Sequence, residues 1–219
     1  VRTVLPSASA TIKLESDMRR NFLVFVFLML ALLPTAAQSA PVLLVFGDSL
    51  SAGYGLPAKA SWPRLLEAEL VRRQSGWRVV NASVSGETTA GGLTRLPAAL
   101  KKHQPQRVVL ELGANDGLRG LPPAEMEKNL ATMIKLIRDS GAEVHLVGMA
   151  LPPNYGADYT KKFAAVYETL ARKHRIGFTP FLLAPIIARP ELFQSDGLHP
   201  TREAQPLLMQ LMLNDLQIQ

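Results

Sequence analysis

Short apolar runs rich in β-branched residues alternate with amphipathic stretches of helical period along most of the chain. The runs, which predict strands, are Val42–Phe46, Arg78–Asn81, Arg107–Leu112, Glu143–Gly148 and Gly177–Pro180. The amphipathic stretches, which predict helices, are Trp62–Gln74, Thr88–His103, Pro123–Ser140, Asp158–His174 and Arg202–Leu216. Strands that alternate with helices pair in parallel, and near-continuous apolar strands imply a sheet covered on both faces. The pattern predicts an α/β fold: a three-layer α/β/α sandwich with a five-stranded parallel sheet.

A segment near the N-terminus has the layout of an export signal. Met18–Asn21 is short and basic, and Phe22–Leu33 is an unbroken apolar run of 12 residues. Small residues then lead to Ser39. This order is typical of a secretory signal peptide, whereas a transmembrane helix needs about 20 apolar residues. An uncleaved N-terminal anchor is the alternative.

We expect translation to begin at Met18, because nothing before it shows a structural pattern, and cleavage to follow Ser39. Cleavage one residue later would place Pro41 just past the scissile bond. The predicted organisation is an N-terminal extension with the signal peptide over residues 1–39 and a single domain over residues 40–219. We expect that domain to be periplasmic or secreted, with no stable membrane span after cleavage.

The composition excludes several kinds of site. The 219 residues include no cysteine, which rules out disulfides, thiolate metal sites and a cysteine nucleophile. No pair among the four histidines has metal-ligand spacing, so no metal site is expected. The formal net charge is +6, but no basic stripe with interleaved aromatic residues occurs, so nucleic-acid binding is not expected. We interpret the scattered basic residues as a solvated surface, with weak attraction to anionic lipid as the alternative.

Polar residues and glycines follow the first three predicted strands. Gly47–Ser49 follows the first strand, Gly86 lies beyond the second, and Gly113–Asp116 follows the third. Ligands bind outside the carboxyl ends of parallel strands, so these segments can meet at one site. A serine there is a candidate nucleophile, and an asparagine amide is a candidate oxyanion donor. Each segment also has a simpler structural explanation as a helix cap, a turn glycine or an Asx-turn.

A fourth segment near the C-terminus, Asp196–Pro200, brings together an aspartate and a histidine three residues apart. The Asp196 carboxylate would fix the tautomer of His199 and stabilise its imidazolium form. Taken alone, this segment is better explained as a surface turn with a solvated histidine. Asp48 is a second acid close to the serine, but the spacing to the histidine favours Asp196. No Gly-x-Ser-x-Gly elbow surrounds Ser49, so the α/β-hydrolase arrangement does not fit.

Taken together and in this order, the four segments resemble the sequence blocks of the GDSL (SGNH) hydrolase family. The matching residues are Gly47-Asp48-Ser49-Leu50, Gly86, Gly113-x-Asn115-Asp116 and Asp196-x-x-His199. Within that family the chain is most similar to the bacterial periplasmic thioesterase/lysophospholipase group, also called arylesterases. The resemblance runs from Val42 to the C-terminus and implies the flavodoxin-like SGNH hydrolase fold.

The resemblance implies a serine hydrolase that needs no metal and no organic cofactor. Ser49 would be the nucleophile, His199 the general base and Asp196 the residue that orients the histidine. The backbone N–H groups of Ser49 and Gly86 and the side chain of Asn115 would form the oxyanion hole. The implied activity is cleavage of acyl esters or thioesters through an acyl-enzyme on the serine, as in an esterase, a thioesterase or a lysophospholipase.

Apolar residues in the loops after these motifs are candidates for an acyl groove, with ordinary loop packing as the alternative. They are Leu118, Leu121, Leu151, Pro152 and Tyr155. The expected partner is a small acyl ester or thioester, with lysophospholipid among the candidates, and we expect a monomer. Two other functions stay open: a carbohydrate or small-ester deacetylase, and a non-catalytic periplasmic binding protein. The presence of only two tryptophans disfavours the first, and the complete set of catalytic residue types disfavours the second.

Overall fold

The computed structural model describes residues 40–218. The predicted start at Met18 and the predicted cleavage after Ser39 concern residues outside this range, and so does the predicted extension over residues 1–39. Within residues 40–218, no helix is both long enough and apolar enough to cross a membrane.

Five parallel strands form one sheet in the order β2-β1-β3-β4-β5. Their bounds are β1 Val42–Gly47, β2 Arg78–Asn81, β3 Arg107–Glu111, β4 Glu143–Val147 and β5 Gly177–Thr179. The predicted five-stranded parallel sheet is confirmed: every strand begins at the predicted residue and ends within one residue of the predicted end. The strand order reverses between β1 and β3, and such switch points open a crevice at the carboxyl ends of the strands.

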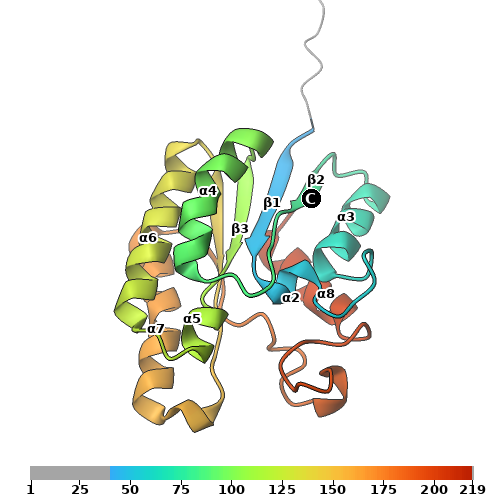
Figure 1. Cartoon of the computed structure of the whole chain (residues 1–219). Helices are drawn as coiled ribbons and strands as arrows, with labels where there is room; N and C mark the ends of the chain where they lie inside the picture. The colour runs from blue at the N-terminus through green and yellow to red at the C-terminus, as the bar shows by residue number, and fades with distance from the viewer. Residues whose placement is uncertain (1–39, 219) are drawn as a thin grey trace, which may run out of the picture. The chain divides into compact units, whose positions relative to one another are not determined.

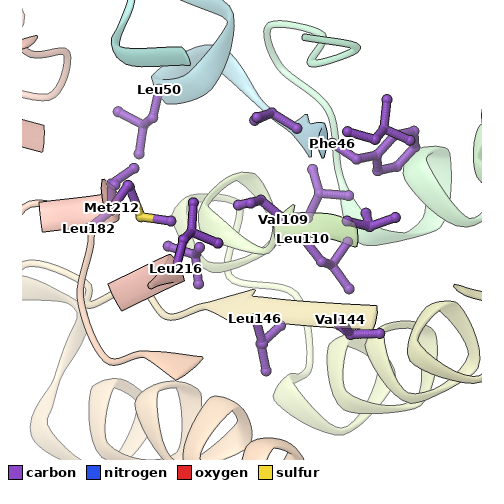
Figure 2. Close-up of a cluster of buried hydrophobic side chains, with 14 of the residues drawn as sticks. Phe46, Leu50, Val109, Leu110, Val144, Leu146, Leu182, Met212 and Leu216 are labelled. Carbon is purple, nitrogen blue, oxygen red and sulfur yellow. The ribbon is translucent and has the colours of Figure 1, made fainter. Parts of the chain in front are cut away.

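Five helices cover the two faces of this sheet, as Figure 1 shows. On one side lie α3 Trp62–Arg72 and α8 Gln205–Leu216, and on the other lie α4 Thr89–His103, α6 Pro123–Asp139 and α7 Ala157–His174. The predicted three-layer sandwich is therefore confirmed. Side chains of all three layers close the core, and Figure 2 shows part of it, with Phe46, Leu110, Leu146 and Met212 among the buried residues.

The last helix begins three residues later than predicted, at Gln205 instead of Arg202. Pro206 explains the difference, because its ring would collide with the carbonyl of Arg202 if both lay within the same helix. Proline is favoured in the first helical turn, and this is the place that Pro206 occupies.

Four short helical turns in the segments that follow the strands were not predicted. These are α2 Ser49–Ala52, α5 Ala114–Leu118 and the 3₁₀ turns η1 Pro153–Tyr155 and η2 Pro190–Leu192. In Figure 1, α2 and α5 lie directly below the arrowheads of β1 and β3, at the switch point of the sheet. They carry the serine and the asparagine singled out in the sequence.

Candidate active site

The nucleophile candidate is presented by a capped turn. Ser49 begins α2 directly after β1, and Asp48 caps this helix, with Oδ1 accepting a hydrogen bond from the N–H of Leu50 at 3.0 Å. Asp48 is fully buried, whereas Ser49 is partly exposed. The capping role expected of a serine in the simpler interpretation thus belongs to Asp48, and the serine hydroxyl is left at the carboxyl edge of the sheet.

Ser49, His199 and Asp196 form one hydrogen-bonded chain. His199 Nε2 lies 2.8 Å from Ser49 Oγ, and His199 Nδ1 lies 2.6 Å from Asp196 Oδ2. Because a carboxylate only accepts hydrogen bonds, Nδ1 carries the imidazole proton and Nε2 is free to accept the serine proton. The sequence-predicted triad residues therefore meet, and Asp196 rather than Asp48 contacts the histidine.

The Asp196 carboxylate is fixed by its own loop. Oδ1 accepts hydrogen bonds from the backbone N–H groups of Leu198 at 2.9 Å and His199 at 3.0 Å, while Oδ2 faces the ring. Partial burial acts to raise the pKa of Asp196, but these hydrogen bonds outweigh it and lower that pKa to about 2. The carboxylate is therefore ionised at neutral pH, as a group that stabilises an imidazolium must be.

The predicted oxyanion donors line the same cavity as Ser49. Gly86 has a left-handed backbone (φ 78°) with nothing within 4 Å of the position of a Cβ, so conformation and not space requires the glycine. The Asn115 amide donates to Asp48 Oδ2 at 3.1 Å and to the carbonyl of Glu87 at 3.0 Å. This links the nucleophile turn, the Gly86 loop and α5.

A cavity of about 780 Å³ opens beside Ser49 and His199. This volume is within the range of about 300–1,000 Å³ that small-molecule sites occupy. Its walls are mainly apolar, and they include Tyr54, Leu118, Met149, Leu151, Pro152, Phe181, Leu183, Ile187, Phe193 and Leu198. The arrangement combines a nucleophile and base with space for a hydrocarbon group.

Three of the five predicted groove residues line this cavity: Leu118, Leu151 and Pro152. The other two do not. Tyr155 supports the wall from behind, because its hydroxyl donates to the carbonyl of Leu118 at 3.1 Å. Leu121 lies past the end of α5, where its N–H bonds back to Asp116, and its side chain is 40% exposed.

Sequence reasoning missed the wall that the segment between β5 and α8 supplies. Phe181, Leu183, Ile187 and Phe193 all come from it. Their apolar spacing after β5 was a usable signal, but the segment has no helical or strand period. Its contact with the cavity depends on long-range contacts, such as the hydrogen bond from Gln194 to the carbonyl of Tyr54 in the turn after α2.

Two further residues hold the histidine loop and were also missed. The ring of Tyr54 lies 4.5 Å from that of His199, centroid to centroid. Gln194 Nε2 donates to the carbonyls of Tyr54 at 2.9 Å and Pro200 at 3.0 Å. The turn after α2 and the turn that carries the histidine are thereby tied together across 140 residues of chain.

The described residues hold no group of three or more His, Asp or Glu side chains arranged for a metal ion. The hydrogen-bonded site described above consists of a serine, a histidine, carboxylates and amide donors. The sequence profile of the GDSL-like lipase/acylhydrolase family matches residues 45–206. The chain belongs to this family.

Known members of similar sequence cover almost the whole domain. An arylesterase of Vibrio mimicus is 47% identical over 184 residues, which are 84% of this chain and 92% of that protein. The thioesterase 1/protease 1/lysophospholipase L1 of Escherichia coli (strain K12) is 45% identical over 191 residues, 87% of this chain and 90% of that protein. A crystal structure of TesA superposes with a TM-score of 0.78 at 46% identity and covers 80% of this chain and 97% of that one.

These matches confirm the predicted family, the predicted fold and the predicted enzyme class, a hydrolase of esters or thioesters. They do not favour the deacetylase or the binding-protein alternative.

Proposed function

We propose that this GDSL-family hydrolase cleaves acyl esters and thioesters through an acyl-enzyme formed on Ser49. The observation that carries the proposal is the hydrogen-bonded chain from Ser49 Oγ to His199 Nε2 and from His199 Nδ1 to Asp196 Oδ2. A nucleophile, its base and a group that orients the base are the parts that acyl transfer requires.

In the first half-reaction, Ser49 Oγ attacks the acyl carbonyl carbon and His199 Nε2 takes the hydroxyl proton. The imidazolium that forms is stabilised by the ionised Asp196. The tetrahedral intermediate then collapses, the bond to the leaving alcohol or thiol breaks, and the histidine returns its proton to the leaving group. In the second half-reaction a water molecule repeats these steps on the acyl-enzyme and releases the acid.

The developing oxyanion would be met by the N–H groups of Ser49 and Gly86 and by the Asn115 amide. Loss of one such donor commonly reduces kcat by about 10²–10³-fold. The Asn115 amide already donates to Asp48 and Glu87, so an oxyanion would share one of these hydrogens. The existing bonds keep the amide in place before the substrate binds, which reduces reorganisation during the reaction.

The apolar cavity would hold the acyl chain, and medium-chain and long-chain esters, thioesters and lysophospholipids are the substrates it suits.

Leu118 lines the cavity, whereas Leu121, three residues later, lies outside it. We therefore expect Leu118→Asp to reduce kcat/KM on decanoyl esters at least tenfold more than on acetyl esters, since a carboxylate in an apolar cavity is strongly disfavoured. Leu121→Asp is the matched control and should leave the chain-length profile unchanged. Equal losses on both chain lengths in Leu118→Asp would contradict this use of the cavity.

The direct test of the proposal is an assay of the protein from Ala40 onward on p-nitrophenyl esters from acetyl to palmitoyl, beside Ser49→Ala. We expect activity that peaks at medium or long chains, and loss of both activity and fluorophosphonate labelling in the variant. Activity confined to acetyl esters would instead indicate a small-ester deacetylase. Full activity in Ser49→Ala would overturn the assignment of the nucleophile.

We also propose that the enzyme is exported and works as a periplasmic or secreted monomer. The basic segment, the 12-residue apolar run and the small residues before Ala40 support export. Cell fractionation and N-terminal sequencing should find the enzyme outside the cytoplasm with Ala40 as its first residue. A cytoplasmic enzyme, or a mature form that begins at Met18, would contradict this proposal.

A further inference from the structure

Glu111 is a fully buried carboxyl group beneath the nucleophile turn, and no step of the mechanism uses it. It is the last residue of β3 and pairs in register with Gly47, the last residue of β1. A Cβ at position 47 would collide with Glu111 Oε2. The glycine that precedes the Asp48-Ser49 pair is therefore needed because a carboxyl group occupies the space over it.

The carboxyl group holds the turn on both sides of Ser49. Glu111 Oε2 accepts a hydrogen bond from the Ser51 hydroxyl at 2.6 Å and a longer one from the backbone N–H of Asp48 at 3.3 Å. Ser51 is itself fully buried. The residue before the nucleophile and the residue two positions after it are thus both anchored to the end of β3.

The surroundings of Glu111 disfavour a negative charge. Burial raises the pKa of Glu111 well above the usual value, and the neighbouring Asp48 carboxylate raises it further, although the hydrogen bonds from Ser51 and Asp48 act the other way. Asp48 also has a pKa raised to about 6, mainly by burial, although its capping bond and the charge of His199 act the other way. Asp116 of α5 raises the pKa of Asp48 as well, and the buried hydroxyl of Tyr167 of α7 has its own pKa raised by Glu111, Asp48 and Asp116.

We propose that Glu111, in its protonated and neutral form, is a positioning residue that holds Ser49 in line with His199. Its neutral carboxyl accepts the bonds from Asp48 and Ser51 without placing a second buried charge beside Asp48. Deprotonation would put two carboxylates in contact with the turn, and like charges at such short range repel strongly in a poorly solvated interior. The turn would shift, and misplacement of a reacting group by about 1 Å can cost about 10²-fold in rate.

The inference rests on the proposed role of Ser49 and is tested with Glu111→Gln and Glu111→Ala in the protein from Ala40 onward. Glutamine mimics the neutral acid and keeps an acceptor oxygen, whereas alanine removes both anchors. The readouts are kcat and KM on a p-nitrophenyl ester, and the rate of fluorophosphonate labelling from pH 6 to pH 10. Tyr167→Phe is the matched control, because its buried hydroxyl bonds the Leu112 carbonyl at the end of the same strand.

For Glu111→Ala we expect kcat to fall about 10²-fold with KM changed less than about threefold, since the turn and not the acyl cavity is disturbed. Glu111→Gln should keep kcat within about threefold of the wild type at pH 7. It should also lack the alkaline decline in labelling rate that ionisation of Glu111 causes in the wild type. Tyr167→Phe should lower stability but leave kcat within twofold. If Glu111→Ala does not fold, Ser51→Ala removes one anchor alone and should lower kcat in the same direction.

Three results would overturn the inference. One is a folded Glu111→Ala with wild-type kcat. The second is a folded Glu111→Gln as inactive as the alanine variant, which would mean that the charge is required. The third is a labelling profile of Glu111→Gln that superimposes on that of the wild type. Ser49→Ala, assayed in parallel, distinguishes failure of the inference from failure of the proposed function. Activity that survives in Ser49→Ala would overturn the proposed function, and the inference with it.

Discussion

At the scale of single residues, hydrogen bonds within the histidine loop itself determine most of the loop's geometry. Asp196 uses one oxygen to bond two backbone N–H groups of its own turn and the other to bond the His199 ring. All partners lie within three residues, so this part of the site is readable from a short stretch of sequence. Glu111 and Gln194 are the opposite case, because their partners Ser51 and Tyr54 lie 60 and 140 residues away and become neighbours only in the folded chain.

The first prediction concerns the charge on Asp196. Asp196→Asn keeps an oxygen for the two backbone N–H groups but presents an NH₂ group to Nδ1, so the imidazole proton moves to Nε2. Nε2 then no longer accepts the proton of Ser49, and we expect kcat to fall by about 10³–10⁴-fold. The measurement is kcat at pH 7 with a thermal melt to show an intact fold.

The pH dependence of the wild type provides a second check on Asp196. Its pKa of about 2 means that the carboxylate stays ionised throughout the usual assay range. Any loss of wild-type activity between pH 4 and pH 8 should therefore reflect the titration of groups other than Asp196.

A decrease in kcat of less than tenfold in Asp196→Asn would contradict the role assigned to the carboxylate.

At the scale of elements, the long helices and most strands were predictable because the spacing of their apolar residues repeats several times within each element. The short turns α2 and α5 were not, since four and five residues cannot display a period. They form through local devices instead: the Asp48 cap in one case and Gly113 in the other, whose backbone has a φ of 120°. A side chain at position 113 would also collide with the Tyr167 hydroxyl, a contact that no sequence pattern reveals.

A buried polar chain joins β4, β5 and α8. The Thr179 hydroxyl donates to Asp215 Oδ2 at 2.6 Å, so His145 Nε2, 2.9 Å away, must donate to the threonine oxygen. Burial lowers the pKa of His145 to about 4, and the ring is therefore neutral at pH 7. None of these three residues lines the cavity.

The second prediction is that Thr179→Val destabilises the fold without impairing catalysis. Valine keeps the shape but leaves the buried N–H of His145 without an acceptor, which costs about 1–3 kcal/mol. Urea denaturation at pH 7 should show this loss, with kcat changed less than twofold at 25 °C. Thr132→Val is the control, since that exposed hydroxyl bonds only a carbonyl of its own helix, and its effect should stay within about 0.5 kcal/mol. A loss as small as that of the control would show that the chain contributes little.

At the scale of the whole molecule, buried ionisable groups give stability two opposite dependences on pH. The lowered pKa of His145 means that its contribution is present above pH 6.5 and is lost as pH falls toward about 4. The raised pKa values of Asp48 and Glu111 act in the other direction. Their contributions are complete below pH 4, where the unfolded chain also binds the protons, and are lost as pH rises toward the folded-state pKa.

The third prediction follows from the separation of these ranges. Above pH 7 the pKa values of His145 (about 4) and Asp48 (about 6) have been passed, so among the three groups we assign any further change in the free energy of unfolding to Glu111, whose pKa burial raises well above the usual value. We expect the wild type to lose stability between pH 7 and pH 9, by at most about 1.4 kcal/mol per pH unit. Glu111→Gln should show a flatter profile over the same range, because it has no proton to lose.

Urea denaturation of the protein from Ala40 onward at pH 7, 8 and 9 measures both slopes. Any constant cost of the glutamine amide shifts the whole curve of Glu111→Gln and leaves its slope unaffected. His145→Gln is the control: its slope should match that of the wild type above pH 7 and differ from it only between pH 4 and pH 6.5, where the variant lacks the gain in stability that His145 contributes as pH rises. Parallel curves for the wild type and Glu111→Gln would mean that Glu111 does not titrate there, and the alkaline decline in Ser49 reactivity would then need another cause.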